Sequence, residues 1–175
     1  RMHTAMTAAS ATEGAFTADL RVNWCAIPFV TQSWARMVYP SRPVAEAVAK
    51  LWDDVFDVVR VKAPDPVAAW RDHLEALEKR RQSLQALDLS ALHFVGGGTD
   101  LMVGLAEGHQ WVGGRSRAGN GAFPVCNFPT EEVFTSPHRD RVEGRLEASR
   151  PLALGGTIVD GLVVTFRGGA AERIE

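Results

Sequence analysis

The part of the sequence best suited to chemistry holds two adjacent carboxylates, Glu131 and Glu132. Pro129 and Pro137 restrict the backbone on either side of the pair. Short polar side chains in the same segment can bind nearby backbone groups, and its apolar residues, such as Phe128, are expected to anchor it on a core. A carboxylate on so fixed a segment suits a metal ion. The carboxylate is a hard oxygen ligand, and the segment loses little further conformational entropy when the ion binds.

The two carboxylates are not expected to act together. Side chains of neighbouring residues on an extended segment point in opposite directions, so only one of the pair can face a given metal ion. The residues alone leave a simpler interpretation open, in which both are surface carboxylates or one of them caps a turn.

Other patterns give weaker signals. The glycine-rich residues 96–100 lack the Gly-Lys-Ser/Thr of a phosphate loop and predict a tight turn. None of the five histidines stands in a zinc-binding spacing, and His73 and His93 are expected at the core or its boundary. The cysteines, Cys25 and Cys126, are far apart and are interpreted as small buried hydrophobic residues.

The composition excludes two classes of partner. Hydrophobic residues make up 46% of the 175 residues, charged residues 23%, and the net charge is −2, which is ordinary for a globular protein. This balance gives no electrostatic reason to bind nucleic acid or an anionic membrane. No apolar run approaches the roughly 18 residues of a membrane span, and we expect a cytoplasmic protein.

Helical spacing of apolar residues predicts two main helices, over residues 44–60 and 66–87. Asp65 is in place to cap the second helix, with Pro66 in its first turn. Trp52 and Trp70 fall on the apolar stripes and are expected in the core. A shorter helix is predicted over residues 31–38.

Shorter patterns predict strands. Alternation over residues 20–28 predicts an edge strand, and residues 92–95 and 101–105 flank the glycines of a hairpin. Further strands are predicted over residues 141–147, 152–154, 156–159 and 162–166, followed by a turn at 167–169. The fold class is therefore an α/β N-terminal part followed by a β-rich part. We place the domain boundary between 1–87, a partial α/β N-terminal domain, and 88–175, the truncated β-rich start of the metal-binding domain.

Residues 127–137, Asn-Phe-Pro-Thr-Glu-Glu-Val-Phe-Thr-Ser-Pro, resemble the signature of the M29 metallopeptidases, the aminopeptidase T or thermophilic aminopeptidase family. Residues 66–70, 98–105 and 149–152 agree with that family in kind and order. The resemblance implies a two-domain α/β metallopeptidase that is roughly twice this length or more, so we expect the chain to be an interior fragment of one.

The resemblance also implies a function. It implies a hydrolase that removes N-terminal residues from peptides with two divalent metal ions, zinc or cobalt, and that forms homodimers. It identifies Glu132 as a metal ligand, with Glu131 facing elsewhere. The other ligands and any catalytic acid or base would lie in sequence beyond residue 175, so the piece alone is expected to be inactive and need not hold a metal.

Two alternatives remain. The chain could be a non-catalytic binding or assembly module, which the missing ligands favour. It could also be a small-anion binder built on its glycine-rich turns.

Overall fold

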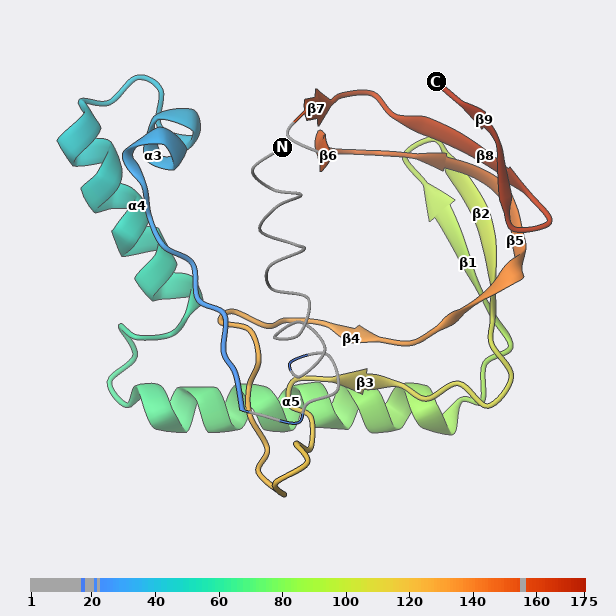
Figure 1. The fold of residues 1–175 in the computed structure, drawn as a ribbon, viewed down its shortest axis with the longest axis horizontal. Helices are drawn as coiled ribbons and strands as arrows, with labels where there is room; N and C mark the ends of the chain where they lie inside the picture. Colours follow the sequence, from blue (N-terminus) through green and yellow to red (C-terminus); the bar gives the residue numbers. More distant parts are fainter. Residues whose placement is uncertain (1–16, 18–20, 22, 155–156) are drawn as a thin grey trace. The chain divides into compact units, whose positions relative to one another are not determined.

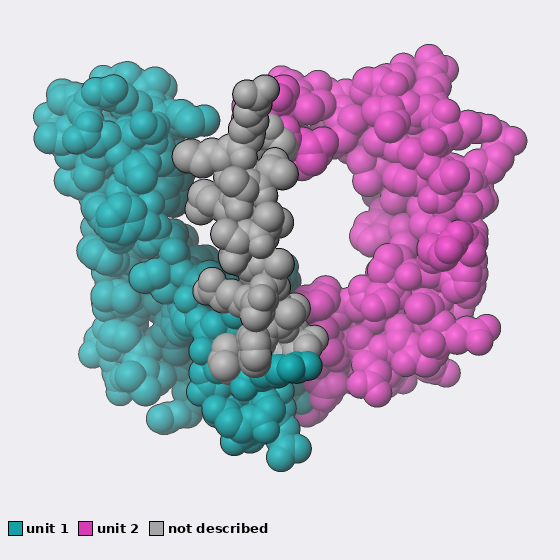
Figure 2. Space-filling view, viewed as in Figure 1, with its two compact units in different colours: residues 1–80, 113–133 teal, residues 81–112, 134–175 magenta. Residues whose placement is uncertain are grey.

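The computed structural model describes residues 17, 21, 23–154 and 157–175. The chain forms helices first and an antiparallel sheet afterwards (Figure 1), which confirms the predicted fold class. It divides into two compact units (Figure 2). The first unit comprises residues 1–80 and 113–133, and the second comprises 81–112 and 134–175. The predicted domain boundary near residue 88 stays a prediction.

All three predicted helices form within two residues of their expected ends. They are α3 (Gln32–Val38), α4 (Val44–Val58) and α5 (Pro66–Ala86). Helices α3 and α5 each begin at a residue whose side chain caps the helix. Thr31 Oγ1 accepts a hydrogen bond from the Trp34 amide at 3.2 Å, and Asp65 Oδ1 accepts one from the Ala68 amide at 2.9 Å. These bonds satisfy amides that have no partner inside the helix.

The core of the first unit lies along one stripe of α4. Ala47, Leu51 and Val55 recur every four residues and are almost fully buried, together with Ala35 of α3. Trp52 packs against this cluster while half-buried, so its expected core position is confirmed in part. Beside it, an open apolar groove of about 830 Å³ includes both Trp52 and Trp70 in its lining.

The strand predicted over residues 20–28 is wrong for the described residues 21 and 23–28. Only Ala26 pairs, in one parallel bridge with Asn127. The Ala26 amide donates to the Cys126 carbonyl at 2.7 Å, and the Phe128 amide donates to the Ala26 carbonyl at 2.9 Å. Pro28 on one segment and Pro129 on the other have no N–H to donate, so the ladder cannot continue.

The second unit is built on a five-stranded antiparallel sheet with the strand order β1-β2-β5-β8-β9. Its strands are β1 (Ala91–Gly96), β2 (Thr99–Leu105), β5 (Pro137–Glu147), β8 (Val163–Arg167) and β9 (Ala170–Ile174). Two short pairs complete the strands: β3 (Val112–Gly113) with β4 (Val133–Phe134), and β6 (Leu152–Leu154) with β7 (Thr157–Val159).

The predicted hairpin is confirmed. Gly96 pairs with Thr99, and the two loop residues Gly97 and Gly98 have φ angles of 57° and 84°. Positive φ at both positions is the type I′ geometry that matches the twist of the flanking strands. The glycine-rich stretch therefore forms a turn, as expected.

Two residues are more exposed than the sequence suggested. The side chain of His93 is 50% exposed, with Nε2 2.7 Å from Asp100 Oδ1. Cys25 is exposed, whereas Cys126 is partly buried and burial raises the pKa of its thiol. His73, with a side chain only 10% exposed, lies at the core boundary as predicted.

None of the helices in the described ranges has the length and apolar character needed to cross a membrane.

Leu77 provides a test of the helical packing. Its side chain is 1% exposed on α5, so Leu77→Ala should lower the free energy of unfolding by about 2–5 kcal/mol through lost burial and a residual cavity. Chemical denaturation measures the change. Leu87, 62% exposed just beyond the helix, is the control, and Leu87→Ala should change stability by no more than about 0.5 kcal/mol. Equal losses in both variants would contradict this packing.

Candidate functional site

The segment that carries Glu131 and Glu132 is anchored in the first unit through Phe128. Its ring centroid lies 4.2 Å from that of Trp70 on α5, and it packs against the α4 core cluster. The Phe128–Pro129 peptide bond is cis. The expected anchoring is confirmed for Phe128, whereas Phe134 is 54% exposed.

Arg60 holds the first of the two carboxylates. Its Nη2 donates to Glu131 Oε1 at 2.8 Å and lies 3.0 Å from Nδ1 of His73, while its Nη1 donates to the Val58 carbonyl at 3.1 Å. The guanidinium also lies over the ring of Trp70, 5.1 Å from its centroid. Glu131 is therefore engaged in an ion pair and is held by a side chain from the end of α4.

His73 extends this network to the backbone. Arginine can only donate, so Nδ1 of His73 must accept, which leaves the ring proton on Nε2. Nε2 then donates to the carbonyl of the buried residue Thr130 at 2.6 Å. Both residues that precede Glu132 are thus fixed, Thr130 by its carbonyl and Glu131 by its carboxylate.

The backbone of Arg60 is itself unusual, with a φ of 61°. The Val61 amide donates to the Phe56 carbonyl and the Arg60 amide donates to the Asp57 carbonyl, each at 3.0 Å. This pair of bonds is a Schellman motif that closes α4, and Arg60 occupies the position where glycine is usual. The left-handed conformation costs a residue with a Cβ atom about 1–2 kcal/mol.

Glu132 differs from Glu131 in its surroundings. Its exposed carboxylate forms no hydrogen bond or ion pair with any other residue that the structure describes. It lines an open pocket of about 500 Å³ bounded by residues 26–28 and 127–132. Its oxygen atoms are therefore available to a cation, and the backbone before them is already ordered.

Gly113 fixes the segment from the other side. A Cβ atom at this position would lie 2.5 Å from the carbonyl oxygen of Glu132 and 3.0 Å from the Cα atom of Val133. Any larger residue would therefore displace the backbone of Glu132. This close approach was not predicted from the sequence, because nothing near Gly113 marks it as a partner of the distant carboxylate.

The end of the same segment is held within the second unit. Thr135 Oγ1 donates to the Gln110 carbonyl at 2.8 Å and lies 2.9 Å from Nδ1 of His109. The other ring nitrogen of His109 lies 2.9 Å from the Leu89 carbonyl. The expectation that short polar side chains bind backbone groups in this segment is confirmed at Thr135.

The residues present fit a metal ion in part. Glu132 is a suitable oxygen ligand, but it does not belong to any group of three possible ligands among the described residues. One carboxylate does not hold a metal ion by itself, so a complete site needs donors from outside the described residues.

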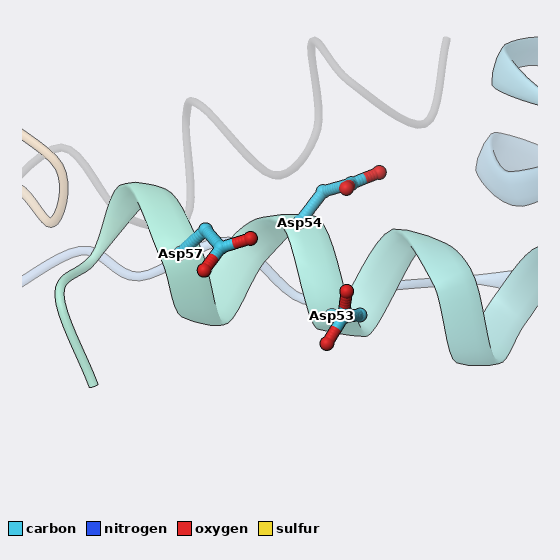
Figure 3. Close-up of side chains that lie close together, drawn as sticks. All are labelled: Asp53, Asp54 and Asp57. Atoms are coloured by element: carbon cyan, nitrogen blue, oxygen red, sulfur yellow. The ribbon is translucent and has the colours of Figure 1, made fainter. Parts of the chain in front are cut away.

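Asp53, Asp54 and Asp57 do come close together, and all three project from α4 (Figure 3). Their charges are already compensated. Lys62 pairs with Asp53 and, at 3.0 Å, with Asp57, while Asp54 accepts hydrogen bonds from Lys50 and from the Tyr39 hydroxyl. The Lys50 bond is the main reason that the pKa of Asp54 is below its usual value, and the Lys62 bond similarly lowers the pKa of Asp53. This cluster is an ion-pair network on the helix surface.

The sequence and the fold of this chain are similar to those of known proteins. The sequence profile described as thermophilic metalloprotease (M29) matches residues 1–175. Aminopeptidase T of Thermus thermophilus is 51% identical over 152 residues, which cover 87% of this chain, and aminopeptidase AmpS of Bacillus subtilis is 36% identical over 149 residues, which cover 85%. The solved structure of wild-type AmpT from Thermus thermophilus aligns with 91% of this chain at a TM-score of 0.83 and 47% identity.

The chain is much shorter than these proteins. It spans 37% of the length of the Thermus thermophilus aminopeptidase T, 36% of the Bacillus subtilis protein and 39% of the solved AmpT chain.

The close approach of Gly113 to the carbonyl of Glu132 can be tested by adding one methyl group at Gly113. Gly113→Ala should lower the free energy of unfolding by about 1–3 kcal/mol, because the added Cβ atom overlaps the Glu132 carbonyl and the backbone must move. Urea denaturation measures the loss. An unchanged unfolding midpoint would show that the two backbones are not this close.

The aspartate network predicts a dependence on pH. The pKa of Asp54 is lower in the folded state than its ordinary value of about 3.9. The ionised carboxylate of Asp54 therefore stabilises the fold at pH values above that ordinary pKa. This contribution disappears as the pH falls through the lower pKa of the folded state. Asp54→Asn should therefore be less stable than the wild type at pH 7, with a difference that shrinks below pH 4. A difference that grows on acidification would contradict the assignment.

Proposed function

Because the chain belongs to the thermophilic metalloprotease (M29) family, we propose that it forms part of a metal-dependent aminopeptidase that removes N-terminal residues from peptides. The observation that supports this most directly is the unengaged carboxylate of Glu132 on a fixed segment. The similarity of the chain to aminopeptidase T and aminopeptidase AmpS agrees with the proposed reaction.

In this proposal Glu132 is a metal ligand and Glu131 is not. Two divalent ions, zinc or cobalt, would supply an activated water molecule and polarise the scissile carbonyl. The part of this chain is to present one carboxylate in a fixed direction, while Arg60 neutralises the neighbouring one. The remaining ligands and the catalytic acid or base would come from other sequence, and the 175 residues alone are then inactive.

We further propose that the enzyme is a cytoplasmic homodimer. Large apolar residues exposed on the first unit, among them Ile27, Phe29 and Val67, are compatible with coverage by another part of the assembly. Sedimentation of the full-length gene product measures its oligomeric state.

A non-catalytic binding or assembly module is the second candidate. It is favoured by the observation that no group of three possible ligands among the described residues includes Glu132. Metal analysis of the full-length gene product separates the two candidates, because stoichiometric zinc or cobalt is expected only of the peptidase.

Exchange of each carboxylate for its amide tests the assignment. In the full-length gene product, Glu132→Gln should remove a charged ligand and reduce both metal content and the hydrolysis of an aminoacyl reporter, by at least about tenfold. Glu131→Gln keeps the shape of its side chain and should do much less. Normal metal content and normal hydrolysis in Glu132→Gln would show that Glu132 is not a ligand.

A further inference from the structure

We propose that Arg60 is a positioning residue for the metal site, which sets the direction of the Glu132 carboxylate without touching the metal ion. This inference rests on the proposed function, since it takes Glu132 as a ligand. It adds a role for a residue that is 71 positions away from the carboxylate it binds.

The contacts of Arg60 reach the segment by two routes. One route is direct, from Nη2 to the carboxylate of Glu131 at 2.8 Å. The other passes through His73, whose Nδ1 lies 3.0 Å from the same Nη2 and whose Nε2 donates to the Thr130 carbonyl at 2.6 Å. One guanidinium thus controls two consecutive residues that lead into Glu132.

The guanidinium is itself held in place. It donates to the Val58 carbonyl at 3.1 Å and lies over the ring of Trp70, and its side chain is 24% exposed. A planar group with several fixed donors can orient two acceptors at once, which a lysine ammonium on a flexible stem does poorly. Arg60 is therefore a rigid connection between the end of α4 and the segment that carries Glu132.

The backbone of Arg60 supports a role for its side chain. At a φ of 61° in the Schellman motif, glycine would be the least strained residue. A residue held in a sparsely populated conformation indicates a local requirement that outweighs the strain. The contacts of the guanidinium to Glu131 and His73 identify that requirement.

Arg60 also neutralises the charge next to Glu132. Without Arg60, the carboxylate of Glu131 would lose its ion pair and the carbonyl of Thr130 would be held by a less constrained imidazole. The segment could then rotate, and Glu131 could compete with Glu132 for a cation. Groups that orient metal ligands without binding the metal commonly change metal affinity by about 10- to 100-fold when they are removed.

Arg60→Asn is the decisive variant, because asparagine tolerates the left-handed conformation but cannot reach Glu131. In the full-length gene product, it should weaken Zn²⁺ binding by at least about tenfold, measured by competition with a chelator. It should also speed hydrogen exchange at the amides of residues 130–132, while the midpoint of thermal unfolding stays at or above that of the wild type. Arg60→Lys should give intermediate Zn²⁺ affinity.

Lys62→Asn is the matched control. It removes a cation two residues away whose contacts are with Asp53 and Asp57, and it should leave Zn²⁺ affinity and exchange at residues 130–132 unchanged. In addition, Arg60→Asn should have a smaller effect on affinity in the Glu131→Gln background than in the wild type, because the neutral side chain at position 131 cannot compete with Glu132 for the cation.

The outcomes separate this inference from the proposed function. If Glu132→Gln abolishes Zn²⁺ binding but Arg60→Asn changes neither affinity nor exchange, the positioning role is wrong and the proposed function stands. If the wild type binds neither Zn²⁺ nor Co²⁺, or Glu132→Gln binds the metal ion normally, both proposals fail. Should Arg60→Asn not fold, wild-type affinity and exchange in Arg60→Lys would overturn the positioning role.

Discussion

The position of Glu132 depends on the contacts of one indole ring. Trp70 donates from Nε1 to the Val59 carbonyl at 2.7 Å, packs against Phe128 and lies beneath the guanidinium of Arg60. The ring therefore joins the end of α4, the first turns of α5 and the segment with the two carboxylates. Aromatic contacts of this kind have preferred geometries and add to the burial of apolar area, so they fix direction as well as distance. The network around Arg60 and His73 could not hold its geometry if this packing were loose.

Local patterns predicted the elements whose causes are local. Helices α4 and α5 follow from apolar residues at helical spacing, a capping aspartate and a proline in the first turn, and the β1–β2 hairpin follows from its glycines. The strand expected over residues 20–28 failed because its pairing depends on residues 126–128, which are distant in sequence and interrupted by Pro129. Strand β9 was missed because Ala-Ala-Glu-Arg-Ile has little of the β-branched and aromatic character of a strand.

The site was predictable only in its most local feature. The sequence identified a carboxylate pair between prolines, and resemblance selected Glu132, a selection that stays a prediction. The contact of Glu131 with Arg60 spans 71 residues and that of Thr130 with His73 spans 57, so no window of sequence contains both partners. One signal in the sequence did mark Arg60 as unusual. The helix over residues 44–58 is followed by Val-Arg-Val-Lys without a glycine, although a glycine is common where a helix closes.

Magnitudes explain why the Arg60–Glu131 pair is better understood as a positioning contact than as a stabilising one. The Glu131 side chain is 57% exposed, and exposed ion pairs contribute about 0.2–1 kcal/mol. The left-handed backbone of Arg60 costs about 1–2 kcal/mol, so the ion pair does not offset the strain by itself. A glycine at this position would close the helix with less strain but would leave Glu131 unpaired next to Glu132. The arginine therefore retains backbone strain at the end of α4, while its guanidinium neutralises Glu131 and leaves Glu132 open to a cation.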